Sequence, residues 1–215
     1  MKSDKDRSVM DQYRCPTGVE GRKVAASMNI HHSSLTDWGL NKVKIYSDFR
    51  ILDVGCGGGK TLTKLAKLAP QGKVFGIDCS KDMVDYSLEV NRDLVTQERV
   101  SIVAGVVDKT GFPDNYFDLV TAVETYYFWP NLQSAFQEMF RILKPNGQLL
   151  IINEMIKDGS YEVENKEMIE KTHVNLMLMS EIKELLATVG YKDVEIFKVS
   201  GSPWNAILAQ KAYET

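Results

Sequence analysis

Cysteine is scarce in this sequence, and so are groupings of residues that bind metals. The three cysteines, Cys15, Cys56 and Cys79, are odd in number and form no Cys-x-x-Cys pair. We therefore expect neither a disulfide framework nor a zinc site, and a reducing compartment suits such a chain. No cluster of Asp, Glu or His stands out near the predicted loops. The sequence predicts a cytoplasmic protein without a bound metal.

Long apolar runs and an excess of positive charge are also missing. No stretch approaches the roughly 20 apolar residues of a membrane span, and no apolar segment follows the charged residues 2–7. Lys and Arg number 26 against 29 Asp and Glu, and a net charge of -3 gives no general attraction to nucleic acid. We expect no export, no membrane insertion and no nucleic-acid partner, with a monomer or a homodimer both open.

The sequence does contain enough apolar residues for one substantial core, at 44% of 215 residues. From about residue 50 onward, strand and helix patterns alternate, which is typical of a parallel sheet with helices on both faces. Predicted strands begin at Arg50 and lie over 73–77, 100–104, 117–123, 148–153, 194–199 and 205–210. Predicted helices lie over 61–69, from Ser80, and over 132–143 and 181–189.

The last two strands are joined by residues 200–203, a connection short enough for an antiparallel hairpin. We therefore predict an α/β fold with a Rossmann-like, doubly wound, mostly parallel seven-stranded sheet, a C-terminal antiparallel hairpin and helices on both faces. Residues 1–45 precede the first predicted strand, and residues 46–215 make up the predicted domain.

The most informative segment is the glycine-rich turn after the first strand, with the sequence Asp-Val-Gly-Cys-Gly-Gly-Gly-Lys over 53–60. Glycine lacks Cβ, so the backbone can turn sharply and a ligand can lie against bare main chain at the start of a helix. A dinucleotide fingerprint requires Gly or Ala where Lys60 stands. A P-loop requires glycine where Val54 stands. Both of these phosphate-binding interpretations are therefore disfavoured.

The remaining pattern, acidic-x-Gly-x-Gly-x-Gly, resembles the first motif of the class I S-adenosylmethionine-dependent methyltransferases. Three further segments are similar to this family in order and spacing. Asp78 ends the second predicted strand, residues 111–120 resemble the L-P-F-x-D-x-x-F-D-x-V segment, and residues 143–149 resemble the L-K-P-G-G-x-L turn. The chain is identified as a member of this family, most similar to the small-molecule branch of ubiquinone and menaquinone C-methyltransferases.

This resemblance implies a cofactor, S-adenosylmethionine, whose product is S-adenosylhomocysteine, bound across the carboxyl ends of the strands. Asp53 would hold the methionine end and Asp78 the ribose hydroxyls. Where the family has Gly-Asp-Ala, this chain has Gly105, Val106 and Val107, so Asp108 is the substitute expected for the acidic adenine contact. The implied cofactor contacts are Asp53, Gly55, Cys56, Gly57, Asp78, Cys79, Met83, Val107, Asp108, Ala122 and Val123.

The acceptor side is less determined by the resemblance. Glu124 follows the fourth predicted strand and could deprotonate or orient an acceptor, or equally cap a loop or the next helix. The aromatic run 126–129 could line a pocket or pack in the core, and Tyr126 is our candidate contact. His31 or His32 could reach the acceptor from a segment that folds over the cofactor, although a solvent-facing histidine is the simpler expectation.

Three functional hypotheses follow. The first, which we favour, is transfer of the methyl group by in-line displacement to a small molecule, in a site covered by residues 1–45 and an insertion at 155–179. The second is a protein or nucleic-acid methyltransferase, which the acidic composition and the lack of an N/D-P-P-Y/F tetrad disfavour. The third is a module that binds the cofactor without turnover.

Overall fold

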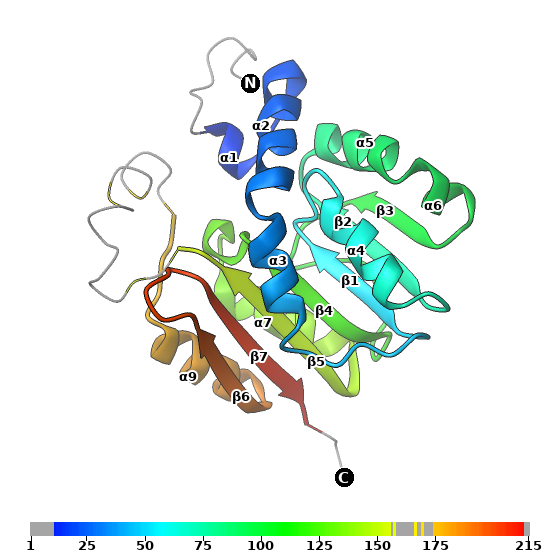
Figure 1. Ribbon diagram of the computed structural model, residues 1–215. Helices are drawn as coiled ribbons and strands as arrows, with labels where there is room; N and C mark the ends of the chain where they lie inside the picture. Colours follow the sequence, from blue (N-terminus) through cyan, green and yellow to red (C-terminus); the bar gives the residue numbers. More distant parts are fainter. Residues whose placement is uncertain (1–10, 156, 158–165, 167–168, 170–173, 213–215) are drawn as a thin grey trace.

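A computed structural model describes residues 11–155, 157, 166, 169 and 174–212. Seven strands form one sheet in the order β3-β2-β1-β4-β5-β7-β6. The first five strands pair in parallel, while β7 is antiparallel to both β5 and β6. The predicted fold class, including the C-terminal hairpin, is confirmed (Figure 1). The strands are β1 (Arg50–Val54), β2 (Lys73–Asp78), β3 (Val100–Ala104), β4 (Phe117–Val123), β5 (Leu143–Asn153), β6 (Tyr191–Lys198) and β7 (Asn205–Lys211).

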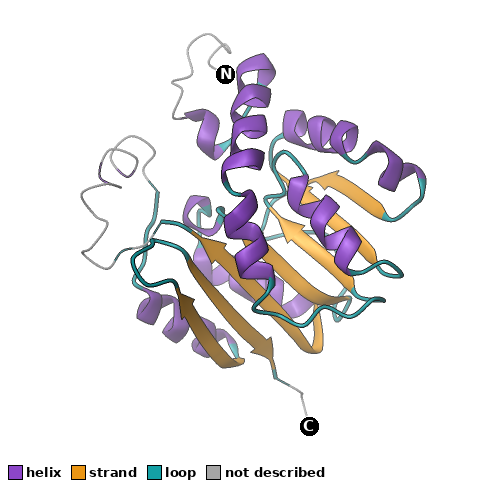
Figure 2. Cartoon of the chain, in the orientation of Figure 1, coloured by secondary structure: helices purple, strands orange, loops and turns teal. Residues whose placement is uncertain are grey.

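Helices cover both faces of this sheet, as Figure 2 shows. Successive strand residues point to opposite faces, so Ile51 packs into one apolar cluster while Leu52 packs into the other. The cluster around Ile51 also holds Leu35 and Leu62, and the cluster around Leu52 holds Phe136 and residues further along the chain. The helices on the Ile51 side are α3 (Ser33–Leu40), α4 (Lys60–Leu68) and α5 (Lys81–Val90), and those on the Leu52 side are α7 (Leu132–Ile142) and α9 (Met179–Val189).

The segment before β1 is helical, which the sequence did not indicate. It forms α1 (Asp11–Arg14) and α2 (Gly18–His31) before α3. Only Gly21 and Ala25 of α2 are buried, because most of this helix projects beyond the sheet, with α5 beside it (Figure 1). A helix with so small a buried face shows little apolar periodicity, and periodicity is the signal on which sequence prediction depends.

Two shorter elements are α6 (Arg92–Thr96) and the 3-10 helix η2 (Tyr126–Phe128). Most of the predicted insertion 155–179 lies outside the described residues. No helix among the described residues is long and apolar enough to cross a membrane.

The turn predicted before the fifth strand is part of that strand. β5 begins at Leu143, which pairs with Phe117, and the register then shifts before Leu119 pairs with Gln148. Asn146 has a φ of +63°, so the irregular residues between these two pairs form a bulge in the strand. The Lys-Pro-Asn-Gly sequence therefore marks an irregularity inside β5, where the sequence had predicted a turn outside it.

The glycine-rich turn makes a testable contribution to stability through Gly59, which begins α4 with a φ of +76°. A Cβ there would clash with Ser87 Oγ and lie 2.6 Å from Asn91 Nδ2. Gly111 has nearly the same φ, +77°, but nothing lies within 4 Å of its Cβ position. Alanine at Gly111 should cost about 1–2 kcal/mol through backbone strain alone. We predict that Gly59→Ala costs about 1–3 kcal/mol more than this matched control, because overpacking adds to the strain.

Urea unfolding of the two variants beside the wild type gives both free energies. Equal losses for Gly59→Ala and Gly111→Ala would contradict the close packing of α5 against the turn.

Candidate functional site

The glycine-rich turn is fixed to the neighbouring strand by backbone hydrogen bonds. Both Gly55 N and Cys56 N donate to Ile77 O, at 2.8 and 3.1 Å. Gly57 N donates to Asp78 Oδ2 at 2.9 Å. Gly55 and Gly57 have φ values of +71° and +47°, which favour glycine. The carboxyl ends of β1 and β2 and the turn between β1 and α4 therefore form one rigid unit.

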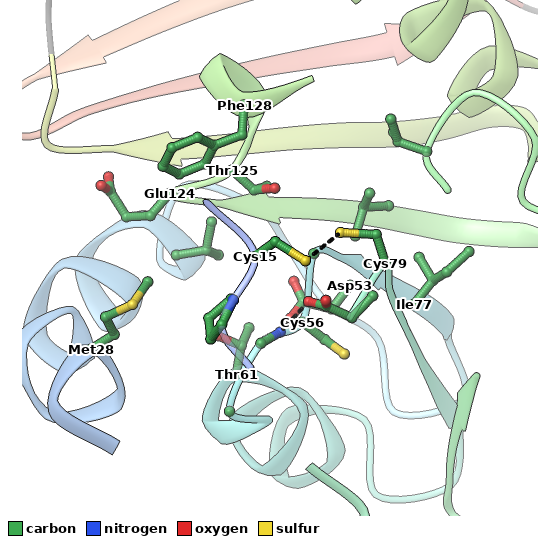
Figure 3. Close-up of a pocket in the computed structure, with 18 of the residues that line it drawn as sticks. Cys15, Met28, Asp53, Cys56, Thr61, Ile77, Cys79, Glu124, Thr125 and Phe128 are labelled. Carbon is green, nitrogen blue, oxygen red and sulfur yellow. Dashed lines mark hydrogen bonds between the residues drawn. The ribbon is translucent and has the colours of Figure 1, made fainter. Parts of the chain in front are cut away.

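This unit borders a cavity of about 390 Å³, which we call the central cavity. Its walls come from the ends of β1, β2 and β4, the loop after β3, and the segment from Tyr13 to Thr36 (Figure 3). In parallel α/β sheets, ligands bind outside the carboxyl ends of the strands, and the central cavity lies at that edge. In the close-up, Glu124, Phe128 and Met28 lie towards one end, and Ile77 and Cys79 towards the other.

Asp53, in β1, is a buried carboxylate at the wall of the central cavity. Its side chain is only 2% exposed, and the Thr121 hydroxyl donates to Oδ1 at 2.7 Å. Burial raises the pKa of Asp53 to about 7, and the negative charge of Asp78 contributes in the same direction, against the Thr121 hydrogen bond. The fold therefore maintains, beside the turn, a carboxylate that lacks a cationic partner among the described residues.

Asp78 ends β2 and holds the backbone of the glycine-rich turn and of the residues that follow β2. Its carboxylate accepts the Gly57 N–H at 2.9 Å and the Ser80 N–H at 2.8 Å. Burial raises the pKa of Asp78, although both N–H groups act to lower it. The next residue, Cys79, places its Sγ 3.9 Å from Cys15 Sγ of the N-terminal segment (Figure 3). Asp78 is thus both a support for the turn and a lining residue of the central cavity.

Glu124 is the third buried carboxylate at this edge. It follows β4 with a φ of +55°, an uncommon and strained value for a non-glycine residue. The Tyr127 hydroxyl donates to Oε2 and the Glu154 backbone N–H to Oε1, each at 2.5 Å. Burial raises the pKa of Glu124 to about 7. Glu124 therefore holds the loop after β5, which is one of the two roles the sequence left open, and it also lines the central cavity.

Two histidines meet Glu154 at the mouth of the central cavity. Glu154 Oε1 lies 3.0 Å from His31 Nε2 and 3.4 Å from His32 Nε2. His32 lines the cavity, whereas the side chain of His31 is 67% exposed and is not among the lining residues. Sequence reasoning named both histidines but missed their contact with Glu154, because no local pattern connects residues more than 120 positions apart.

The central cavity brings together most of the residues proposed from sequence for the cofactor, and Glu124. Met83 and Ala122 are fully buried and are not among its lining residues, because α5 and β4 turn these side chains into the core. Tyr126 is also fully buried, while Phe128 and Trp129 of the same aromatic run line the cavity. The proposed residues that line it are Asp53, Gly55, Cys56, Gly57, Asp78, Cys79, Val107, Asp108, Val123 and Glu124.

Several lining residues were not proposed from sequence. Asn29 donates through Nδ2 to Gly58 O at 3.0 Å, which connects α2 to the glycine-rich turn. Lys64 of α4 binds Ser33 O at 2.7 Å and thereby connects α3 to the same unit. The sequence indicated that the Met-Asn-Ile-His-His segment could fold over the cofactor. It did not predict the polar contacts of this segment, because these depend on the helical geometry of α2 and α3.

The raised pKa of Asp53 predicts a pH dependence of stability. An unfolded aspartate has a pKa of about 3.9, so between roughly pH 4 and 7 the folded state holds a proton that the unfolded state has lost. The free energy of unfolding should therefore fall as the pH rises through this window. Asp53→Asn removes this contribution, and we expect it to stabilise the protein by about 1–4 kcal/mol at pH 8 and to have little effect near pH 4.

Urea unfolding at several pH values measures this difference, with the exposed Asp93→Asn as the control. A pH slope in Asp53→Asn identical to that of the wild type would show that Asp53 titrates normally in the folded protein.

Known proteins share this architecture and parts of this sequence. Residues 52–151 match the family model of a methyltransferase domain. The chain is 27% identical over 172 residues to the sterol 4-C-methyltransferase strm-1 of Caenorhabditis elegans, covering 77% of this chain and 49% of that protein. It is 34% identical over 118 residues to the demethylmenaquinone methyltransferase of Listeria monocytogenes, covering 53% of this chain and 48% of that protein. The chain thus spans about half the length of these two relatives.

A solved structure matches nearly the whole chain. It is a chain of the complex between the Haloferax volcanii Trm112 methyltransferase activator and a methyltransferase, with a TM-score of 0.80, 18% identity and coverage of 96% of this chain and 99% of that one. At this identity the likeness shows the fold alone. The segment that matches the family model contains the glycine-rich turn and both acidic strand ends. Residues 52–151 thus form a methyltransferase domain, and its motifs and fold agree with the class I S-adenosylmethionine-dependent methyltransferases.

Proposed function

We propose that this protein binds S-adenosylmethionine in the central cavity and transfers its methyl group to a small-molecule acceptor, leaving S-adenosylhomocysteine. The observation that carries the proposal is the pair of buried carboxylates, Asp53 and Asp78, on either side of the glycine-rich turn. Burying like charges without a cation is costly, so a ligand that supplies positive charge and hydroxyl donors is the natural partner.

The residues present fit this cofactor in three respects. Asp53 has an acceptor oxygen to spare for an ammonium group, since the Thr121 hydroxyl donates to Oδ1 and leaves Oδ2 for a ligand. Asp78 can accept hydrogen bonds from ribose hydroxyls while its N–H contacts hold it in place. A Cβ on Gly57 would have only Gly55 O within 4 Å, so a side chain there would project into space that a ligand could fill.

The adenine end of the cofactor would lie against the loop after β3. Val107 is buried and Asp108 is exposed, and both line the central cavity. The Asp108 carboxylate can accept from an adenine amino group, and a backbone N–H of Val107 or Asp108 can donate to the ring. Val123, at the end of β4, offers main chain at the same edge.

On the acceptor side, the chain supplies a carboxylate and aromatic surface. When bound, the cofactor supplies a methyl group already activated on a positively charged sulfur. The protein must align an acceptor atom, exclude water and, where the acceptor carries a proton, take it up. Glu124 is positioned for proton uptake, and the strained backbone that holds it there is typical of functional sites. Phe128 and Trp129 give the acceptor an apolar wall.

A small molecule is the acceptor class that these features favour. Residues of α2 and α3 form one wall of the central cavity, so we propose that the N-terminal segment covers the bound acceptor as a lid. The relatives from Caenorhabditis elegans and Listeria monocytogenes act, by their names, on a sterol and on demethylmenaquinone. The net charge of -3 offers little to a nucleic acid.

Cofactor binding is tested by thermal unfolding with added ligands. S-adenosylmethionine and S-adenosylhomocysteine should raise the melting temperature, whereas NAD and ATP should have little effect, because only a ligand that binds the native state stabilises it. Asp78→Ala should lose most of this shift, while the exposed Asp93→Ala should keep it. A shift with ATP alone would refute the proposed cofactor.

Methyl transfer is tested with a labelled methyl donor and a metabolite extract. We expect label in a small molecule, and Glu124→Gln should lower kcat by about 100-fold or more, since a positioned acid or base contributes at least that factor. Glu195→Gln, an exposed carboxylate on β6, is the matched control. The melting temperature of Glu124→Gln, with and without S-adenosylhomocysteine, checks that the fold and the cofactor site remain.

Label in protein or RNA would favour the macromolecular alternative instead. Normal turnover in Glu124→Gln would remove Glu124 from the reaction. Cofactor binding without any labelled product would favour a module that binds and does not turn over.

A further inference from the structure

Three side chains with metal-binding atoms converge at the mouth of the central cavity. They are His31, His32 and Glu154, and one ligand atom from each lies within 4.8 Å of the other two. Glu154 Oε1 is the shared centre, at 3.0 Å from His31 Nε2 and 3.4 Å from His32 Nε2. Among the described residues no other group of three His, Cys, Asp or Glu side chains approaches this geometry. The sequence did not predict this convergence, because Glu154 lies more than 120 positions from the two histidines.

The fold determines the position of these groups. His31 ends α2 and Ser33 begins α3, so the break between the helices falls at His32. Two consecutive imidazoles in one continuous helix would diverge by about 100°, whereas here the rings lie 5.0 Å apart in an edge-to-face arrangement. Glu154 directly follows β5, and its backbone N–H is held by the Glu124 carboxylate. The three groups therefore come from a helix junction and the end of a central strand.

The chemistry of this set suits a divalent transition metal. Two imidazoles and one carboxylate are a ligand set of catalytic zinc sites, in which the fourth position stays open to water or substrate. Imidazole nitrogen excludes magnesium and calcium as the preferred ions, because these bind oxygen ligands.

We propose that His31, His32 and Glu154 bind a divalent transition metal ion of the zinc class at the mouth of the central cavity. The ligand atoms are the two Nε2 nitrogens and a carboxylate oxygen of Glu154. His32 and Glu124 both line the cavity, so an ion bound to His32 Nε2 would border the space in which the proposed acceptor lies. An acceptor that presents an oxygen or a sulfur atom could bind there. This role in acceptor binding rests on the proposed methyl transfer, but metal binding itself does not.

The alternative for the same geometry is an ion pair without a metal. One carboxylate oxygen would then accept from both histidines, and the cluster would only fasten the junction of α2 and α3 to the end of β5. The two interpretations differ in stoichiometric metal binding, so that measurement decides between them.

The test is a competition titration of Zn²⁺ against a chromophoric chelator, using full-length protein without a histidine tag and freed of metal beforehand. We expect one equivalent to bind to the wild type. His31→Ala and Glu154→Gln should each weaken binding by more than about 100-fold, because loss of a residue that merely orients a metal ligand already costs 10–100-fold. His31 is the most informative position, since its exposed side chain can be removed with little effect on packing.

Two control variants separate the loss of a metal ligand from a general effect of substitution. Glu20→Gln removes an exposed carboxylate from the same helix α2 and should bind Zn²⁺ as the wild type does. Cys15→Ser removes one of the two sulfur atoms that lie 3.9 Å apart elsewhere in the cavity and should also leave binding unchanged. Melting temperatures without metal verify that each variant is folded.

Wild-type protein that binds no stoichiometric Zn²⁺ would overturn the proposal, and so would full binding in His31→Ala or Glu154→Gln. Loss of binding in Cys15→Ser alone would assign the metal to the thiols instead. Stabilisation by S-adenosylhomocysteine is measured on the same samples: its absence in the wild type would refute the proposed function and leave the metal result standing, and its presence without Zn²⁺ binding would do the reverse.

Discussion

The hydrogen bonds from Gly57 N and Ser80 N to the Asp78 carboxylate are the constraint on which the site depends. They fasten the glycine-rich turn after β1 to the end of β2, so the turn cannot move away from the sheet. The close approach requires Gly76 beneath it, where a Cβ would lie 2.8 Å from Leu62 Cδ1 and 2.9 Å from Cys56 Sγ. Backbone contacts of this kind leave the N–H groups of the turn and the start of α4 at the edge where the central cavity lies.

The same edge carries an electrostatic cost. Asp53, Asp78 and Glu124 are all nearly fully buried, burial raises the pKa of each, and Glu124 adds backbone strain. Apolar residues of similar size would stabilise a protein more than uncompensated carboxylates do. Local features that reduce stability and face one cavity are the expected mark of a functional site, because a ligand of opposite charge can offset them.

The sequence predicted the sheet well because its central strands, such as β1, β4 and β7, are buried on both faces. Continuous apolar runs such as that of β1, ended by acidic residues, predict strands and also the edge at which Asp53 and Asp78 meet. It predicted less where structure depends on distant contacts. The helix α2 has a narrow buried face, the start of β5 is held by pairing of Leu143 with Phe117, and His32 meets Glu154 although the two residues lie far apart in the sequence. The side chains of Met83 and Ala122 are buried in the core, and a motif does not encode this orientation, because it depends on how the helix or strand lies over the core.

The N-terminal helices connect the two halves of the site. Asn29 of α2 donates to Gly58 O in the turn, and Lys64 of α4 binds Ser33 O and Asp37 Oδ1 of α3. The turn, the start of α4, residues of α2 and α3, and His32 between these two helices all line the central cavity. A ligand that tightens the turn therefore also acts on the segment that carries the histidines. α2 buries only Gly21 and Ala25, whereas Leu35 and Leu40 of α3 pack into the core around Ile51, so α2 can separate from the turn at a smaller cost than α3. Under the proposed function, entry of the acceptor would be linked to order at the glycine-rich turn through Asn29, Lys64 and Asp37.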